Sequence, residues 1–194
     1  EQSEVQPMNQ YTQEHARSYY AASAHGMAQF PGLTADLEAD VCVIGGGFTG
    51  INTAIELAQC GLSVILLEGR RIGWGASGRN GGQLIRGIGH DVSGFAKHIG
   101  AEGVRYLERA GIESVELVGR RIREHGIDCD LRWGFCELAN TPAQFAGLAS
   151  EYAALKESGY AHETRLVEPG QIRTHVVNSG VYAGGLVDMG SGHL

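Results

Sequence analysis

One stretch of the chain, residues 40–83, restricts the folds that this sequence can adopt. It opens with the apolar run Val41-Cys42-Val43-Ile44, which predicts a buried parallel strand because the run is short, rich in β-branched residues and stopped by glycine. Within that strand Cys42 is expected to serve as a small buried hydrophobe. The following six residues, GGGFTG, match the pattern G-x-G-x-x-G, in which a strand turns sharply into a helix. The stretch therefore predicts a βαβ unit of the dinucleotide-binding kind.

Each glycine of this pattern has a physical reason to be glycine. Gly45 allows the sharp turn off the strand, Gly47 leaves room for a pyrophosphate against the backbone, and Gly50 lets the helix and the strand pack closely. The helix is expected to run to about residue 59. Its first residues, Phe48 and Thr49, carry unpaired N–H groups at the positive end of the helix dipole, which favours phosphate binding.

A second expected strand, residues 63–67, ends at Glu68, which lies 18 residues beyond Gly50. A carboxylate at the tip of the second strand can accept hydrogen bonds from ribose hydroxyls and disfavours a 2′-phosphate, so NADP is the least favoured ligand. Gly69 and Arg70 follow directly and belong to the same candidate site. The alternative is an α/β core whose glycines only make turns and whose Glu68 is solvated.

Residues 69–83 contain six glycines, which is unusual after the second strand of a simple βαβ unit. Ordering so much glycine costs conformational entropy. The stretch makes sense if its backbone approaches a flat, polar ligand that supplies compensating contacts. A flexible surface loop is the alternative.

Charge and composition narrow the classes of function. A formal net charge of −7 argues against nucleic acid as a partner, because phosphate-backbone binding needs a basic face. No apolar run approaches the roughly 18 residues of a membrane span, and the N-terminus shows no secretory pattern. These features predict a cytoplasmic protein. The four cysteines and eight histidines show no metal-ligand spacing, so no metal site is predicted.

Beyond residue 100 the pattern changes to alternating helices and strands. Apolar residues at helical spacing predict a long helix over 101–125. The run Thr141-Pro142-Ala143-Gln144 is a strong helix start, with an N-cap threonine, proline in the first turn and glutamine three residues later. Strands are expected at 129–139, with Gly134 allowing a bulge, at 163–167 and at 180–188, and a short helical turn at 168–173.

The segments GGGFTG, LLE and GWGASGRNGGQ together resemble the N-terminal FAD-binding part of the D-amino-acid-oxidase-like (DAO) flavoproteins, which include sarcosine and glycine oxidases. Together with YYAASA upstream, these sequence segments are most similar to the gamma-glutamylputrescine oxidase branch of the family. The resemblance covers residues 19–194. It implies an α/β fold, with an N-terminal arm over 1–39, a Rossmann-like FAD-binding segment over 40–100, and a helical segment with the beginning of an α+β substrate domain over 101–194.

The resemblance also implies which residues hold FAD. Gly45, Gly47 and Gly50 would hold the pyrophosphate, and Glu68 the adenosine ribose. A second group would run along the pyrophosphate and the ribityl chain to the isoalloxazine ring: Ala76, Ser77, Gly81, Gly82 and Gln83. The residues expected nearest the flavin are Arg79, Asn80 and Gln83.

The reaction implied is oxidation of a C–N bond in an amine or amino acid, with a gamma-glutamylputrescine-like substrate. A hydride passes to the flavin, water hydrolyses the imine to an aldehyde or keto product, and dioxygen or another acceptor reoxidises the flavin. No general base or G-x-S-x-G motif stands out, so no catalytic residue is assigned.

Members of this family are longer than the present chain, so we expect it to be the N-terminal part of an oxidase and inactive alone. Its expected partners are a small-molecule amine, and either a second copy or the missing C-terminal half. Two other functions stay open: an NAD-dependent dehydrogenase with the same fingerprint, and a non-catalytic fragment.

Overall fold

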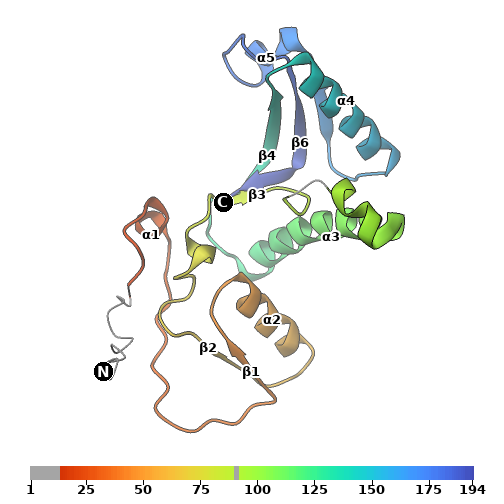
Figure 1. The fold of residues 1–194 in the computed structure, drawn as a ribbon. Coiled ribbons are helices and arrows are strands. Elements are labelled where there is room, and N and C mark those ends of the chain that lie inside the picture. Colours follow the sequence, from red (N-terminus) through yellow and green to blue (C-terminus); the bar gives the residue numbers. More distant parts are fainter. Residues whose placement is uncertain (1–13, 90–91) are drawn as a thin grey trace, which may run out of the picture. The chain divides into compact units, whose positions relative to one another are not determined.

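A computed structural model describes residues 14–89 and 92–194 (Figure 1). The first thirteen residues of the expected N-terminal arm lie outside the described residues. The chain divides into two compact units, one ending at Gly81 and the other beginning at Gly82.

The first unit contains the predicted βαβ arrangement. Its elements are α1 (Tyr19–Ser23), β1 (Val41–Ile44), α2 (Phe48–Gln59), β2 (Val64–Leu67) and the 3-10 turn η1 (Ala76–Gly78). β1 and β2 pair in parallel, from Val41 opposite Val64 to Ile44 opposite Leu67. The starts of the two strands are also joined by side chains, because an Asp40 carboxylate oxygen accepts hydrogen bonds from the Ser63 N–H at 2.8 Å and from its hydroxyl at 2.7 Å. These bonds lower the pKa of Asp40.

The prediction that β1 is a buried strand is wrong for one of its faces. Cys42 is exposed, and Ile44 keeps 85% of its surface exposed. Side chains alternate along a strand, so Val43 faces α2 while Cys42 and Ile44 lie on the opposite face. The described residues place a helix on one face of this two-stranded sheet, and Cys42 is therefore not the buried hydrophobe that the sequence predicted.

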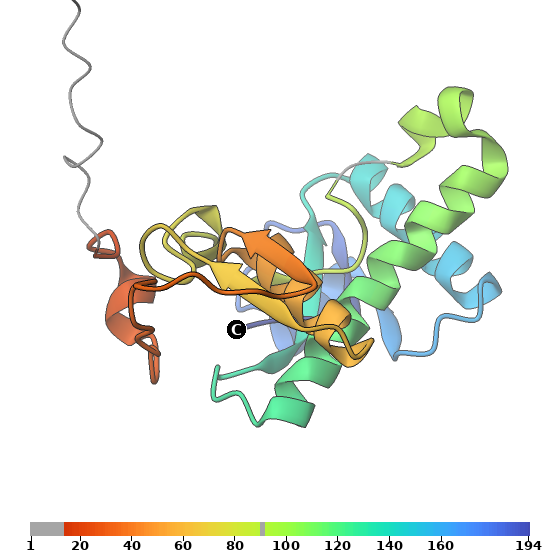
Figure 2. The same cartoon turned by 90° about the horizontal axis from the view of Figure 1, so that it is seen from below.

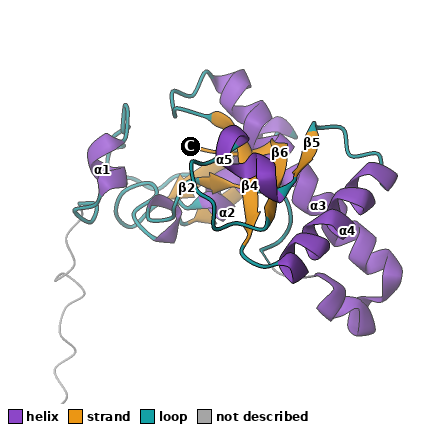
Figure 3. Cartoon of the chain, turned by 90° about the horizontal axis from the view of Figure 1, so that it is seen from above, coloured by secondary structure: helices purple, strands orange, loops and turns teal. Residues whose placement is uncertain are grey.

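The second unit is built around one central strand. Its elements are β3 (Gln83–Leu84), η2 (Val92–Phe95), α3 (Ala96–His125), β4 (Arg132–Ala139), α4 (Pro142–Glu157), β5 (Thr164–Val167), α5 (Pro169–His175) and β6 (Gly184–His193). β6 pairs antiparallel with β3, β4 and β5. Figure 3 labels β4, β5 and β6. α4 packs on this sheet, and a core forms from Ala139, Leu148, Leu155 and Leu186. The sheet is antiparallel, and its helices do not connect parallel strands. The unit therefore has the α+β arrangement that the resemblance implied.

The two long helices of this unit end close to where local sequence predicts, but α3 begins at Ala96, earlier than the expected start at residue 101. The expected helix over 101–125 is confirmed within α3, which is kinked at Gly100 (φ 67°) and ends at the left-handed Gly126 (Figure 2). α4 begins with a capping box in which Thr141 and Gln144 cap each other's backbone. In the part of the chain that the structure describes, neither α3 nor any other helix combines the length and apolarity needed to cross a membrane.

The predicted strand over 180–188 has different bounds in the structure, since β6 starts at Gly184 and continues to His193. Gly190 and Gly192 lie inside the strand and do not stop it. A Cβ at Gly190 would collide with the Tyr160 hydroxyl, and one at Gly192 with the Arg132 carbonyl oxygen. The glycines are therefore needed because neighbouring groups approach the strand closely. In β4, the bulge expected near Gly134 is confirmed by a register shift between Trp133 and Phe135.

Candidate dinucleotide site

The turn from β1 into α2 requires glycine at its two ends. Gly45 has φ 106°, which disfavours other residues, and its N–H donates to the Leu67 carbonyl at 2.7 Å. A Cβ at Gly50 would collide with the carbonyl oxygen of Gly45. The structure thus gives Gly45 and Gly50 the steric roles expected for the first and last glycines of the fingerprint.

The start of α2 is in contact with the glycine-rich stretch. Gly47 is the N-cap residue and offers no side chain there, while the N–H of Phe48 donates to the Ser77 hydroxyl at 2.9 Å. A Cβ at Gly47 would lie 2.9 Å from that hydroxyl oxygen. Backbone N–H groups at a helix start attract anions. The structure therefore brings Gly47, Phe48 and Ser77 together at a point suited to a phosphate.

Glu68 connects the end of β2 to the fingerprint. One of its carboxylate oxygens accepts from the Gly46 N–H at 2.6 Å, and the other accepts from the Arg70 N–H at 2.9 Å. Glu68 is half-buried and Gly46 is buried. A negative charge thus lies directly beside the glycine fingerprint, at the place where the sequence predicted a ribose-binding carboxylate.

The glycine-rich stretch folds back onto the fingerprint. The N–H of Gly73 donates to the Gly46 carbonyl at 2.9 Å, and Gly73 has φ 71°. A Cβ at Gly78 would collide with the Gly73 carbonyl oxygen, so the stretch also packs against itself. The Asn80 amide donates to the Ser77 carbonyl at 2.8 Å. The stretch is therefore an ordered loop in contact with residues 46–48, which argues against the alternative of a loose surface loop.

The remaining predicted residues occupy two settings. In the first unit, four of them are exposed to solvent: Thr49, Gly69, Ala76 and Gly81. Gly82 and Gln83 belong to the second unit, where the Gly82 carbonyl accepts from the Leu194 N–H at 2.9 Å and Gln83 pairs with His193 in the sheet.

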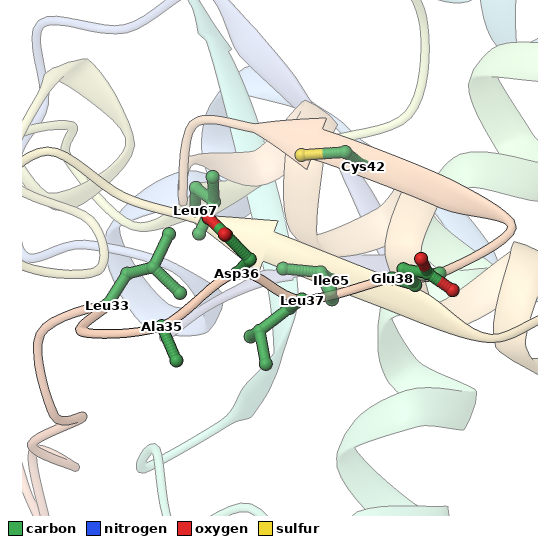
Figure 4. Close-up of a pocket in the computed structure, with 9 residues that line it drawn as sticks. Leu33, Ala35, Asp36, Leu37, Glu38, Cys42, Ile65 and Leu67 are labelled. Carbon is green, nitrogen blue, oxygen red and sulfur yellow. The ribbon is translucent and has the colours of Figure 1, made fainter.

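A groove of about 620 Å³ forms where the extended segment 33–39 runs beside β1 and β2 (Figure 4). Its lining residues are Leu33, Ala35, Asp36, Leu37, Glu38, Ala39, Cys42, Ile65 and Leu67. None of the residues predicted to hold the cofactor lines it. The groove is thus separate from the candidate dinucleotide site.

Sequence reasoning missed a buried polar cluster in the second unit. Asp188 is 2% exposed, and its carboxylate accepts four hydrogen bonds: from Arg86 Nε at 3.0 Å, the Tyr160 hydroxyl at 3.0 Å, the Gly190 N–H at 2.9 Å and the Ser191 hydroxyl at 2.8 Å. The sequence signal was weak, since only an acidic residue within an otherwise apolar and glycine-rich strand marks the position. The cluster joins the residues after β3 to the central strand.

Two groups of this cluster have shifted pKa values. Burial works to lower the pKa of Arg86, but its 2.6 Å hydrogen bond to Glu151 and the charges of Glu151 and Asp188 outweigh burial and raise that pKa. Burial, with the adjacent Asp188 carboxylate, raises the pKa of the Tyr160 phenol. The arrangement therefore keeps Arg86 charged and Tyr160 protonated.

No metal site accompanies these features in the described ranges, 14–89 and 92–194. There, His, Cys, Asp and Glu side chains do not gather in groups of three or more that could hold a metal ion.

A parallel βαβ unit, a glycine turn, an acidic second-strand end and a loop folded onto the turn define an α/β protein with a Rossmann-like dinucleotide-binding segment. The family model described as "FAD dependent oxidoreductase" (DAO) matches residues 40–194. The chain therefore belongs to the DAO family of FAD-dependent oxidoreductases, and FAD is its cofactor. The prediction of FAD is confirmed over the NAD alternative, and the start of α2, where Gly47 offers no side chain, fits a dinucleotide.

Curated relatives support this membership. The chain is 40% identical over 183 residues to "Probable oxidoreductase OrdL" of Haemophilus influenzae, covering 94% of this chain and 42% of the relative. It is 40% identical over 181 residues to "Gamma-glutamylputrescine oxidoreductase" of Escherichia coli, covering 93% of this chain and 42% of the relative. The chain thus spans less than half the length of these two relatives.

Solved structures show the same fold. An L-amino acid deaminase from Proteus vulgaris, solved with the deletion of its specific insertion sequence, has a TM-score of 0.66 at 23% identity, over 88% of this chain and 42% of that chain. A glycine oxidase from Geobacillus kaustophilus has a TM-score of 0.57 at 24% identity, over 80% of this chain and 40% of that chain. These likenesses agree with the predicted fold class.

Proposed function

We propose that the protein carrying this chain oxidises a C–N bond of an amine or amino acid to an imine, which water hydrolyses to an aldehyde or keto product, with dioxygen as the electron acceptor. A gamma-glutamylputrescine-like amine is the proposed substrate. The observation that carries this proposal is the 40% identity to an Escherichia coli gamma-glutamylputrescine oxidoreductase across 93% of the chain. Bound FAD would supply the two-electron acceptor for this oxidation.

We further propose how the first unit holds the adenosine half of FAD. The N–H of Gly47 and the Ser77 hydroxyl would donate to the pyrophosphate, with Phe48 beside them. The Phe48 N–H donates to the Ser77 oxygen at 2.9 Å and so holds that hydroxyl at the start of α2, while the hydroxyl keeps its own proton to donate. Glu68 would accept from the ribose hydroxyls, supported by its place at the end of β2.

We propose the same role, in contact with cofactor, for the other residues of the candidate site: Gly45, Thr49, Gly50, Gly69, Arg70, Ala76, Asn80, Gly81, Gly82 and Gln83. The corresponding domain division is an arm over 1–39, an FAD-binding segment over 40–100, and the start of a substrate domain over 101–194. The rest of the substrate domain, or a second copy of the chain, would complete the active enzyme.

The test uses the whole protein, purified with its flavin. Under nitrogen, the visible absorbance of oxidised flavin is followed after adding gamma-glutamylputrescine, putrescine, glycine, sarcosine, and D- and L-amino acids in turn. Bleaching by gamma-glutamylputrescine, followed by recovery when air is admitted, is the expected result. Bleaching by amino acids alone would change the proposed substrate from a gamma-glutamylputrescine-like amine to an amino acid. If no amine bleaches the flavin, the proposed reaction is overturned.

A further inference from the structure

The segment before the βαβ unit contacts the glycine-rich loop at two points, both through Glu14. Arg71 Nη2 donates to Glu14 Oε1 at 2.8 Å, and the Trp74 indole N–H donates to the Glu14 backbone carbonyl at 2.9 Å. These contacts join residues 57 and 60 positions apart in the sequence. Nothing in the dinucleotide fingerprint requires them.

Trp74 is also held by the loop's own arginines. The guanidinium carbon of Arg70 lies 3.8 Å from the centre of the Trp74 ring, and that of Arg79 lies 5.4 Å from it. Both distances are within the range of cation–π attraction. The indole is therefore fixed by cations near its ring and by the Glu14 carbonyl at its N–H.

Arg71 and Trp74, which bond to Glu14, lie on either side of Gly73, which bonds to the fingerprint. Gly73 lies between Arg71 and Trp74 in the sequence, and its N–H donates to the Gly46 carbonyl at 2.9 Å. Further along the same loop, the Ser77 hydroxyl accepts from the Phe48 N–H. This short loop is thus bonded both to the N-terminal segment and to the turn that precedes α2.

We propose that Glu14, Arg71 and Trp74 form a latch that keeps the glycine-rich loop docked on the fingerprint, so that the N-terminal segment controls how tightly the protein retains FAD. The three are positioning residues. The inference rests on the proposed assignment of this loop to FAD. Its physical basis is that ordering a glycine-rich loop costs entropy, and the apparent affinity for a ligand falls in proportion to the fraction of molecules whose loop is docked.

The two contacts of the latch differ in expected strength. The side chains of Arg71 and Glu14 keep 31% and 70% of their surface exposed, so water and salt screen their ion pair. Replacing the half-buried Trp74 by Phe removes the indole hydrogen bond and also weakens the cation–π contact with Arg70, because indole is the stronger cation–π partner. We therefore expect about fivefold faster FAD release for Trp74→Phe, and about twofold for Glu14→Gln or Arg71→Gln.

The experiment measures FAD release from the whole, flavin-loaded protein, as the rise of free-flavin fluorescence after dilution. A second readout follows tryptic cleavage after Arg70 and Arg79 in protein stripped of FAD, where a loosened loop is cut faster. The charge-reversed pair Glu14→Arg with Arg71→Glu should restore slow release relative to either single reversal. Arg109→Gln, which removes an exposed pair with Glu113 on α3, is the matched control.

Faster release and faster cleavage in Trp74→Phe and Glu14→Gln, with rescue by charge reversal, support the latch. Rates equal to those of Arg109→Gln in a parent that binds FAD would overturn the latch and leave the proposed cofactor site standing. A parent that holds no flavin would overturn both. If Trp74→Phe does not fold, the surface change Glu14→Gln and the charge reversal still decide the outcome.

Discussion

Asp188 binds Arg86 by a 3.0 Å hydrogen-bonded ion pair across 102 positions of the sequence. Asp188 is almost fully buried, and the Arg86 side chain keeps 19% of its surface exposed. Removing Asp188 would leave Arg86 with Glu151 alone and would take the acceptor from the Tyr160 and Ser191 hydroxyls and the Gly190 N–H, which costs far more than the loss of a surface pair. The pair therefore matters more to the second unit than the ion pairs on the exposed face of α3.

For this reason Asp188→Ala is expected to lower the free energy of unfolding by about 3 kcal/mol. Glu113→Ala, which breaks the exposed pair with Arg109, should change it by less than about 0.5 kcal/mol. Urea denaturation of the whole protein measures both. Equal effects of the two changes would contradict the weight given to the buried pair.

Tyr160 predicts a dependence of stability on alkaline pH. Its pKa is raised in the folded protein from an ordinary value of 10.0, so the unfolded chain loses the phenolic proton first as pH rises. The contribution is fully present below that ordinary pKa and is lost above it, as pH approaches the folded-state pKa. We expect the parent to lose stability above about pH 10 more steeply than Tyr160→Phe, in matched denaturation series. Parallel slopes for the two proteins would exclude this contribution.

Gly47→Val is expected to abolish FAD binding. The added side chain would stand at the start of α2, with its Cβ 2.9 Å from the Ser77 hydroxyl, where the pyrophosphate is proposed to lie. Flavin content per mole of purified protein is the measurement. Gly147→Ala is the control, because that glycine lies within α4 with nothing within 4 Å of an added Cβ, and it should keep full flavin.

Glu68 is expected to contribute moderately to cofactor retention. Glu68→Gln replaces the carboxylate, which accepts from the Gly46 N–H and is proposed to accept from the ribose, by a neutral amide. This change should weaken FAD binding by at most about 1.5 to 3 kcal/mol. Glu68→Ala should weaken it further, because it also removes the acceptor. Equilibrium dialysis against a series of FAD concentrations tests both, and retention equal to the parent in both variants would remove Glu68 from the ribose site.

Substitutions at two small residues, Ala76 and Gly81, can distinguish a role in cofactor contact from a role in protein packing. Ala76 is exposed, and nothing lies within 4 Å of a Cβ built on Gly81. The protein alone should accommodate Ala76→Leu and Gly81→Val, at a cost within about 0.5 kcal/mol of unfolding free energy. If these positions lie along FAD, both variants lose flavin while remaining folded. Normal flavin absorbance in both would contradict their place in the site.

Much of the first unit was predictable from sequence because its signals are local. The strand, the turn and the helix from Val41 to Gln59 follow from an apolar run, three spaced glycines and the residues between them. The start of α4 was predictable for the same reason, since Thr141 and Gln144 cap each other three residues apart. The position of Glu68 beside the fingerprint followed from the fixed length of a βαβ unit.

Residues close together in the chain were thus enough to predict the βαβ unit, its cofactor class and the ends of the main helices. Four other features emerged only from the folded arrangement: Cys42 is exposed, β6 runs on through Gly190, Asp188 binds Arg86, and Glu14 accepts from Trp74. These features depend on partners up to 102 positions away in the sequence. No local periodicity encodes such partners, because they are brought together only when the elements pack.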